Sequence, residues 1–179
     1  VRFSPDGTKF VGRVGSEKIE LYNTKKRKLV SKDSHKIGFD FNSIVFSPDG
    51  TKIAVSGQSK IAVCNTQALS ICNTLGKKEP FSEIYSVVFS TDGTKLAVGG
   101  CANGRYGNTI VLYDLENQEV IYSLFCTSAL YVRVGFSRDG TKFAYRDNQK
   151  VVVCNAENQE MICTLACSSG RGLVFSPDG

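Results

Sequence analysis

The sequence contains no tryptophan, one methionine and one histidine among its 179 residues. Catalysis by a serine or cysteine nucleophile needs a base, and the one histidine, His35, stands in a charged segment from Lys32 to Lys36. The Gly-x-Ser-x-Gly, P-loop and dinucleotide-binding glycine patterns are missing as well. We therefore expect neither an enzyme nor a bound cofactor.

Long apolar runs are also missing, because no stretch approaches the roughly 18 residues of a membrane-spanning helix. We expect no transmembrane insertion. The seven cysteines include no Cys-x-x-Cys pair, and on one strand Cys163 and Cys167 would lie about 13 Å apart. A disulfide needs Cα atoms within about 7 Å. We expect reduced thiols, no metal site and a cytoplasmic or nuclear location, with Cys101, in a glycine-rich loop, as the most reactive thiol.

The chain does contain a recurring motif, Phe-Ser-Pro-Asp-Gly, some copies of which differ at a single position. Its phenylalanines are Phe3, Phe46, Phe89, Phe136 and Phe175, spaced by 39 to 47 residues. A period in this range indicates a repeat architecture. Ser-Pro-Asp-Gly is typical of a type I turn, and short apolar runs such as Ile61 to Cys64 are typical of buried strands. Four such strands per unit predict an all-β fold, a β-propeller of four-stranded antiparallel blades.

The repeat predicts about four blades plus one strand, with 1–179 as a single propeller segment. The expected blades are about 1–33, 43–76, 85–126 and 132–167, followed by the first strand of a fifth at 172–179. Two arrangements are compatible with this content: an open arc of a larger propeller of about seven blades, or a small four-bladed ring. The same motif stands at both ends. This favours the arc and predicts that the remaining blades belong to a longer chain.

The order of these features resembles the WD40 repeat family over essentially the whole chain. The family's Trp-Asp position falls on Tyr22-Asn23, Cys64-Asn65, Tyr113-Asp114 and Cys154-Asn155. The Gly-His pair is missing. The aspartate that the family places six residues before its tryptophan is replaced by Ser16, Gln58, Gly107 and Asn148. The His–Asp–Trp hydrogen-bond network of the family is thus absent, and we expect apolar packing to hold the blades. The resemblance implies a non-catalytic scaffold for protein or peptide partners.

In such a propeller, the loops between second and third strands and the loops between blades share one face. We expect partners there, since arginine and tyrosine dominate binding hot spots. The candidate partner-binding residues are Arg13, Tyr85, Arg105, Tyr106, Tyr131, Arg146 and Arg171. Phe39, Phe41 and Phe81 occur in the same loops, where we expect them to fill the gaps between blades.

A basic bend, Lys25, Lys26, Arg27 and Lys28, is expected on the opposite face and is the candidate anion-binding site. At about 1 kcal/mol per cation, four cations give roughly millimolar affinity for an anionic membrane. The bend contains no interleaved aromatics, which argues against nucleic-acid stacking, and we expect no nucleic-acid partner. A solubilising role is favoured.

Two other functions remain open at this point. The chain could be a propeller segment of a TolB-like or prolyl-oligopeptidase-like enzyme-associated protein, because those repeats also use Ser-Pro-Asp-Gly. It could also be an adaptor for anionic lipid or nucleic acid through the basic face.

Overall fold

The computed structural model describes residues 1–30, 34–67, 69–75, 81–102, 107–126, 132–147, 150–167, 172–176 and 178. The chain forms two compact units, Val1–Glu79 and Pro80–Gly179, and each contains two antiparallel sheets. Within the described ranges there is no helix, and hence none with the length and apolar character to cross a membrane. The predicted all-β fold is confirmed.

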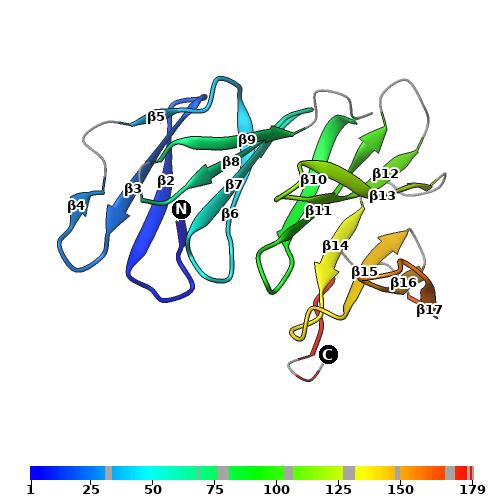
Figure 1. Cartoon of the computed structure of the whole chain (residues 1–179). Helices are drawn as coiled ribbons and strands as arrows, with labels where there is room; N and C mark the ends of the chain where they lie inside the picture. The colour runs from blue at the N-terminus through cyan, green and yellow to red at the C-terminus, as the bar shows by residue number, and fades with distance from the viewer. Residues whose placement is uncertain are drawn as a thin grey trace. The chain divides into compact units, whose positions relative to one another are not determined.

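The first unit holds two sheets whose strands follow one another in sequence (Figure 1). The first sheet contains β1 (Arg2–Phe3), β2 (Lys9–Val14), β3 (Lys18–Asn23) and β4 (Lys28–Leu29) in that order, with β5 (His35–Lys36) also paired to β3. The second sheet contains β6 (Phe41–Phe46), β7 (Lys52–Gly57), β8 (Ile61–Asn65) and β9 (Ile71–Leu75) in that order.

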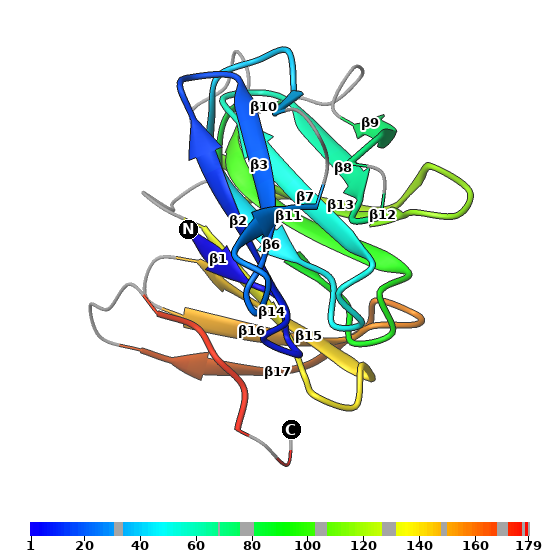
Figure 2. The same ribbon diagram turned by 90° about the vertical axis from the view of Figure 1, so that its left-hand side faces the viewer.

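The second unit repeats this plan. The third sheet contains β10 (Phe81–Phe89), β11 (Lys95–Ala102), β12 (Asn108–Asp114) and β13 (Glu119–Cys126) in that order. The fourth contains β14 (Arg133–Phe136), β15 (Lys142–Asp147), β16 (Lys150–Asn155) and β17 (Met161–Ala166), with β17 at the outer edge (Figure 2). The four-stranded antiparallel meanders predicted from the sequence are therefore present in both units.

Two boundaries differ from the sequence-based expectation. The second and third sheets begin earlier than expected, because β6 starts at Phe41 and β10 at Phe81. Residues 172–176, expected to open a fifth blade, form no strand. A strand needs a neighbour for its ladder hydrogen bonds, and no described segment provides one to these residues.

A serine–aspartate network closes the turn between the first two strands of each sheet. In the second sheet, the Ser47 hydroxyl donates to Asp49 Oδ1 at 2.6 Å and accepts the Lys52 N–H at 2.9 Å. Asp49 also accepts the N–H and the hydroxyl of Thr51, at 3.0 and 2.7 Å. Gly50 has a φ of 69°, which glycine adopts without strain. Equivalent serine contacts occur at Ser4, Ser90 and Ser137. The repeated aspartates are turn formers, as predicted.

Because side chains alternate between the faces of a strand, each sheet has two faces that recur from repeat to repeat. We name as the leading face the one that carries the paired residues Ile53 and Cys64 in the second sheet. The trailing face is the one that carries the paired residues Val11 and Leu21 in the first sheet. The pairs at the leading positions of the other sheets are Phe10–Tyr22 in the first, Leu96–Tyr113 in the third and Phe143–Cys154 in the fourth.

In each unit, the trailing face of one sheet packs on the leading face of the next. One buried cluster of the first unit contains Val11, Ile19 and Leu21 together with Ile53, Val55, Ala62 and Cys64. The corresponding cluster of the second unit contains Ala97, Ile110 and Leu112 together with Phe143, Tyr145, Val152 and Cys154. Complete burial of one such leucine or isoleucine contributes about 2 to 3 kcal/mol. Apolar packing between faces is thus a main source of stability within each unit.

Candidate functional site

The leading face of the first sheet is aromatic and only partly covered. The rings of Phe10 and Tyr22 are stacked, with centroids 4.8 Å apart and planes inclined by 8°. Phe3 lies tilted against Phe10 at 5.7 Å, and its side chain is 64% exposed. These three rings, with Thr24 and Arg27, line a hollow of about 460 Å³, which we call the aromatic hollow. Aromatic side chains contribute most to packing when they are buried. A group of three rings that is partly open to solvent is therefore unusual.

Tyr22 adds a polar group to this hollow. Its hydroxyl donates to Glu20 Oε2 at 2.5 Å. The hydrogen bond to Glu20 raises the pKa of Tyr22, followed by burial and the charge of Glu20. The phenol therefore stays protonated at neutral pH, and its donor is already used within the sheet.

The basic bend follows β3 directly. Lys25, Lys26, Arg27 and Lys28 are all exposed. The Asn23 side chain accepts the Lys26 N–H at 2.8 Å, and Arg27 has a φ of 50°, so the bend is a defined turn. No aromatic residue interrupts this run of cations in the sequence, but rings lie beside it in the folded chain. Strand pairing brings Phe3, Phe10 and Tyr22 beside Arg27, although they are distant from it in sequence or on other strands.

Arg13, a candidate partner-binding residue, is exposed and connects two sheets of the first unit. Its guanidinium donates to the Phe41 carbonyl oxygen, to the Gly15 carbonyl oxygen at 2.7 Å and to Asp40 Oδ1 at 2.5 Å. Its Cζ lies 5.0 Å from the centroid of the Phe41 ring. Charge-assisted hydrogen bonds of this kind hold loop backbone in place. Phe41 and Phe81 are buried, in agreement with the expected packing role, and Phe39 packs against the core cluster of the first unit.

Arg133, which sequence analysis missed, makes a comparable connection in the second unit. Its Nη1 donates to the Tyr85 carbonyl oxygen at 2.6 Å and so joins β14 to β10. Burial, followed by the charge of Glu83, raises the pKa of Tyr85 to about 12. Arg146, paired with Arg133 across β14 and β15, is buried rather than presented to solvent. The remaining candidates, Arg105, Tyr106, Tyr131 and Arg171, lie outside the described residues.

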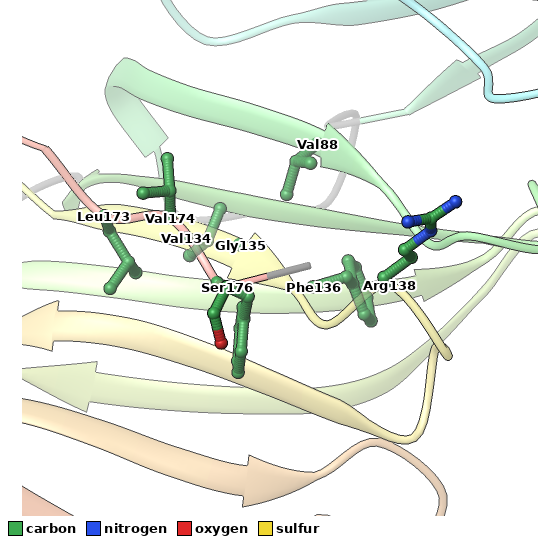
Figure 3. Close-up of a pocket in the computed structure, with 9 residues that line it drawn as sticks. Val88, Val134, Gly135, Phe136, Arg138, Leu173, Val174 and Ser176 are labelled. Carbon is green, nitrogen blue, oxygen red and sulfur yellow. The ribbon is translucent and has the colours of Figure 1, made fainter. Parts of the chain in front are cut away.

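A second hollow, of about 500 Å³, lies beside β14 in the second unit. Its lining is mainly apolar and comes from Val88, from residues 134–136 with Arg138, and from residues 173–176. Figure 3 shows these side chains gathered where the C-terminal segment passes β14. A methyl group at Gly135 would meet the Leu173 carbonyl oxygen at 3.8 Å, an ordinary contact. The C-terminal segment therefore covers the part of the trailing face that belongs to β14.

The titratable groups outside these surfaces form no catalytic arrangement in the part of the chain that the structure describes. Burial lowers the pKa of His35, and its Nε2 has no hydrogen-bond partner among the described residues. Three or more His, Cys, Asp or Glu side chains placed to bind a metal ion do not occur in the described ranges.

The described cysteines differ widely in exposure. Cys64, Cys126 and Cys154 are buried, and Cys101 and Cys167 are half-buried. Cys163 is exposed, so exposure favours Cys163 over Cys101 as the first of the described thiols to react, although the sequence predicts Cys101. The reason is that Cys163 lies on β17, whose side chains are all exposed.

Comparison with known proteins identifies the fold and nothing more specific. No family model and no curated protein matches the chain. Among solved structures, the chain is similar to hydrazine synthase of Kuenenia stuttgartiensis, a protein that contains a β-propeller, with a TM-score of 0.77 and 19% sequence identity. The match covers 99% of this chain and 52% of that one, so this chain spans about half its length. The repeated four-stranded sheets fit a β-propeller.

Proposed function

We propose that the chain is a WD40-like propeller segment that acts as a non-catalytic scaffold for a protein or peptide partner. The observation that carries this proposal is the aromatic hollow with the adjacent basic bend. Tyrosine and arginine are residue types that dominate binding hot spots, and here half-buried Tyr22 and exposed Phe3 and Arg27 line one hollow. The working surface is therefore assigned to the basic-bend side, because Arg13 and Arg146 serve the fold.

The bends after the third strands support the WD40-like part of the proposal. In each sheet, the residue at the aspartate position of the family's Trp-Asp pair ends the third strand. Its side chain accepts a backbone N–H of the bend. The acceptors are Asn23, Asn65, Asp114 and Asn155, at 2.7 to 2.8 Å from the nitrogens of Lys26, Gln67, Glu116 and Glu157. The equivalence of these contacts supports four blades of one open propeller arc.

The proposal is tested by affinity capture with the whole chain as bait. We expect the double variant Phe3→Ser/Arg27→Ser to lose the partner, because it removes the most exposed ring and the one cation that lines the hollow. The matched control is Val120→Ser/Lys60→Ser, which changes an exposed aliphatic residue and an exposed lysine on other sheets. Equal capture by both variants would contradict the proposal.

The aromatic hollow with the adjacent basic bend also favours a second candidate function, an adaptor for single-stranded nucleic acid or anionic lipid. Cations beside stacked rings are what a base-stacking surface needs. Binding of this kind weakens steeply with salt, whereas binding to an apolar surface of a protein does not. A salt titration with an oligonucleotide and with phosphatidylserine vesicles therefore separates the candidates. No described residue favours the enzyme-associated alternative.

A further inference from the structure

The fourth strand of the first sheet is interrupted (Figure 1). Its two parts, β4 and β5, pair with opposite ends of β3, β4 at Tyr22 and Asn23 and β5 at Lys18 and Ile19. In the other three sheets the fourth strand is continuous over five to eight residues. A two-residue strand makes few ladder hydrogen bonds, so β5 depends on its side chains to stay on β3.

His35 is the side chain that β5 directs toward the core of the first unit. It pairs with Ile19, and residues directly opposite each other on antiparallel strands point to the same face. Ile19 is fully buried in the cluster between the first two sheets. His35 is half-buried, and its Nε2 is buried without a hydrogen-bond partner among the described residues. A neutral imidazole tolerates this position, whereas an imidazolium would need an acceptor for its Nε2–H.

The charges around β5 also favour a neutral imidazole. Lys36 follows His35 on β5 and lies directly opposite Lys18 on β3, so two cations already face each other. Glu17 offsets part of this repulsion, because its Oε2 lies 3.4 Å from Lys36 Nζ. The other charged side chains that the structure describes at this end of the two sheets are Arg13, Asp40 and Lys60. Cations thus outnumber carboxylates here, and a charge on His35 would add to the excess.

The segment that leads from β5 into the second sheet is anchored independently of β5. Arg13 donates to Asp40 Oδ1 and to the Phe41 carbonyl oxygen. A methyl group at Gly57 would collide with the Asp40 carbonyl oxygen, so this backbone lies directly on the end of β7. Gly38, with a φ of 86°, joins the anchored part to β5. Rotation at Gly38 therefore allows β5 to leave β3 while β6 stays in place.

We propose that residues 35–37 form an acid-sensitive latch on β3, which protonation of His35 releases while the rest of the first unit stays folded. Release breaks the ion pair between Lys36 and Glu17 and the hydrogen bond from the Ile37 N–H to the Glu17 carbonyl oxygen, which is 2.7 Å long. It also withdraws Ile37 from the buried cluster of the first unit. The latch is independent of the proposed function, because it lies at the end of β3 opposite to the basic bend.

Acid should open the latch in a pH range of its own. Burial lowers the pKa of His35 in the folded chain, so the released form binds the proton more readily. The stability of the closed form is therefore complete above the unfolded value of about 6.5 and is lost as the pH falls below it. Hydrogen bonds hold the pKa of Asp6 at about 2, so turn aspartates of this kind do not titrate between pH 7 and 5.

The test combines nuclear magnetic resonance with hydrogen exchange on the whole chain. The sequence contains one histidine, so the imidazole signals belong to His35 and follow its protonation directly. The protection of the Ile37 N–H against exchange reports the closed latch. We expect a His35 midpoint below about 6.5 and a fall in Ile37 protection of about tenfold between pH 7 and 5. The amides of β11, in the second unit, are the internal control and should keep their protection.

Three variants separate His35 from other causes. His35→Phe keeps a ring on this face without a charge, so Ile37 protection should no longer depend on pH between 7 and 5. Lys18→Gln should move the opening to lower pH and Glu17→Gln to higher pH, because they remove a neighbouring cation and a neighbouring carboxylate. The matched control is Lys150→Gln, an exposed lysine that begins the third strand of the fourth sheet, and it should change nothing.

A His35 midpoint at or above about 6.5, or Ile37 protection that is constant through the titration, would overturn the inference. Opening that persists in His35→Phe would also overturn it, since another group would then be responsible. If His35→Phe does not fold, the opposite shifts of Lys18→Gln and Glu17→Gln decide, and equal midpoints in both would refute the latch.

Discussion

The first and second sheets have the same turns, the same strand order and nearly the same register, yet their leading faces differ. In the second sheet this face holds Ile53 and Cys64, which are fully buried. In the first sheet the equivalent positions hold Phe10 and Tyr22, which are half-buried and stacked. Compact aliphatic or thiol side chains suit a face that another sheet covers tightly. Flat rings with a phenol suit a face that is partly open to water.

The largest effect should distinguish these two faces by stability. Ile53→Ala removes buried atoms and leaves a cavity, so we expect a loss of about 3 kcal/mol in the free energy of unfolding. Phe10→Ala, at the equivalent half-buried position, should cost about 1 kcal/mol, because less area is withdrawn from water. Urea unfolding at low protein concentration measures both. Equal losses would show that the two faces are covered alike.

The turns should behave identically in the two sheets. Ser47→Ala removes a buried hydroxyl and leaves the Lys52 N–H without this acceptor, so we expect a loss of about 1 to 2 kcal/mol. Ser4→Ala should cost about the same, because Ser4 makes the same contacts with Asp6 and Lys9. Urea unfolding of the two variants decides the point. A clearly smaller loss for Ser4→Ala would mean that the first sheet is less ordered than the second.

Much of this similarity could be predicted from the sequence, because it is local. Ser47, Asp49 and Thr51 are near neighbours in the chain, and their hydrogen bonds need only the turn itself. The aromatic hollow could not be predicted in this way, since Phe3, Phe10 and Tyr22 come together only through strand pairing.

The same reason explains why the contacts of Arg13 could not be predicted. The contact of Arg13 with Phe41 joins residues on different sheets, and an exposed loop arginine and a bridging arginine have the same sequence signature. Arg133 gave no signal for the same reason, because its acceptor is the backbone of a distant strand.

A pH titration should reveal the repeated turn aspartates. Burial raises the pKa of Asp49, but the hydrogen bonds from Ser47 and Thr51 outweigh it and lower the pKa from 3.8 to about 2. Hydrogen bonds from the turn serine lower the pKa of Asp6 and of Asp139 to about 2 as well. Because these values are depressed in the folded state, their stabilisation is complete above the unfolded value near pH 4 and is lost as the pH falls through 2.

The melting temperature should therefore fall steadily between about pH 4 and 2. Asp49→Asn should flatten this dependence while lowering the melting temperature at neutral pH. A pH profile that Asp49→Asn leaves unchanged would contradict the role given to the turn network.

Thiol labelling should have the smallest effect on stability, and its rates report the exposure of the two leading faces. Native Cys64 should react slowly with a thiol reagent, because it is buried on the covered leading face. A cysteine introduced by Tyr22→Cys, at the equivalent position of the first sheet, should react at least tenfold faster at low protein concentration. Cys163 should be the fastest native thiol, ahead of Cys101. Mass spectrometry measures these labelling rates. Similar rates at positions 22 and 64 would mean that the two leading faces do not differ in exposure.

The central proposal is that the aromatic hollow and the basic bend contact a protein or peptide partner. The most direct measurement is photo-crosslinking from a benzoylphenylalanine placed at Phe3 in the whole chain, followed by mass spectrometry of the crosslinked products. We expect crosslinks to a distinct protein that are lost with Arg27→Ser and kept with Lys60→Ser. Crosslinks confined to this chain, or crosslinks that Arg27→Ser leaves unchanged, would contradict the proposal.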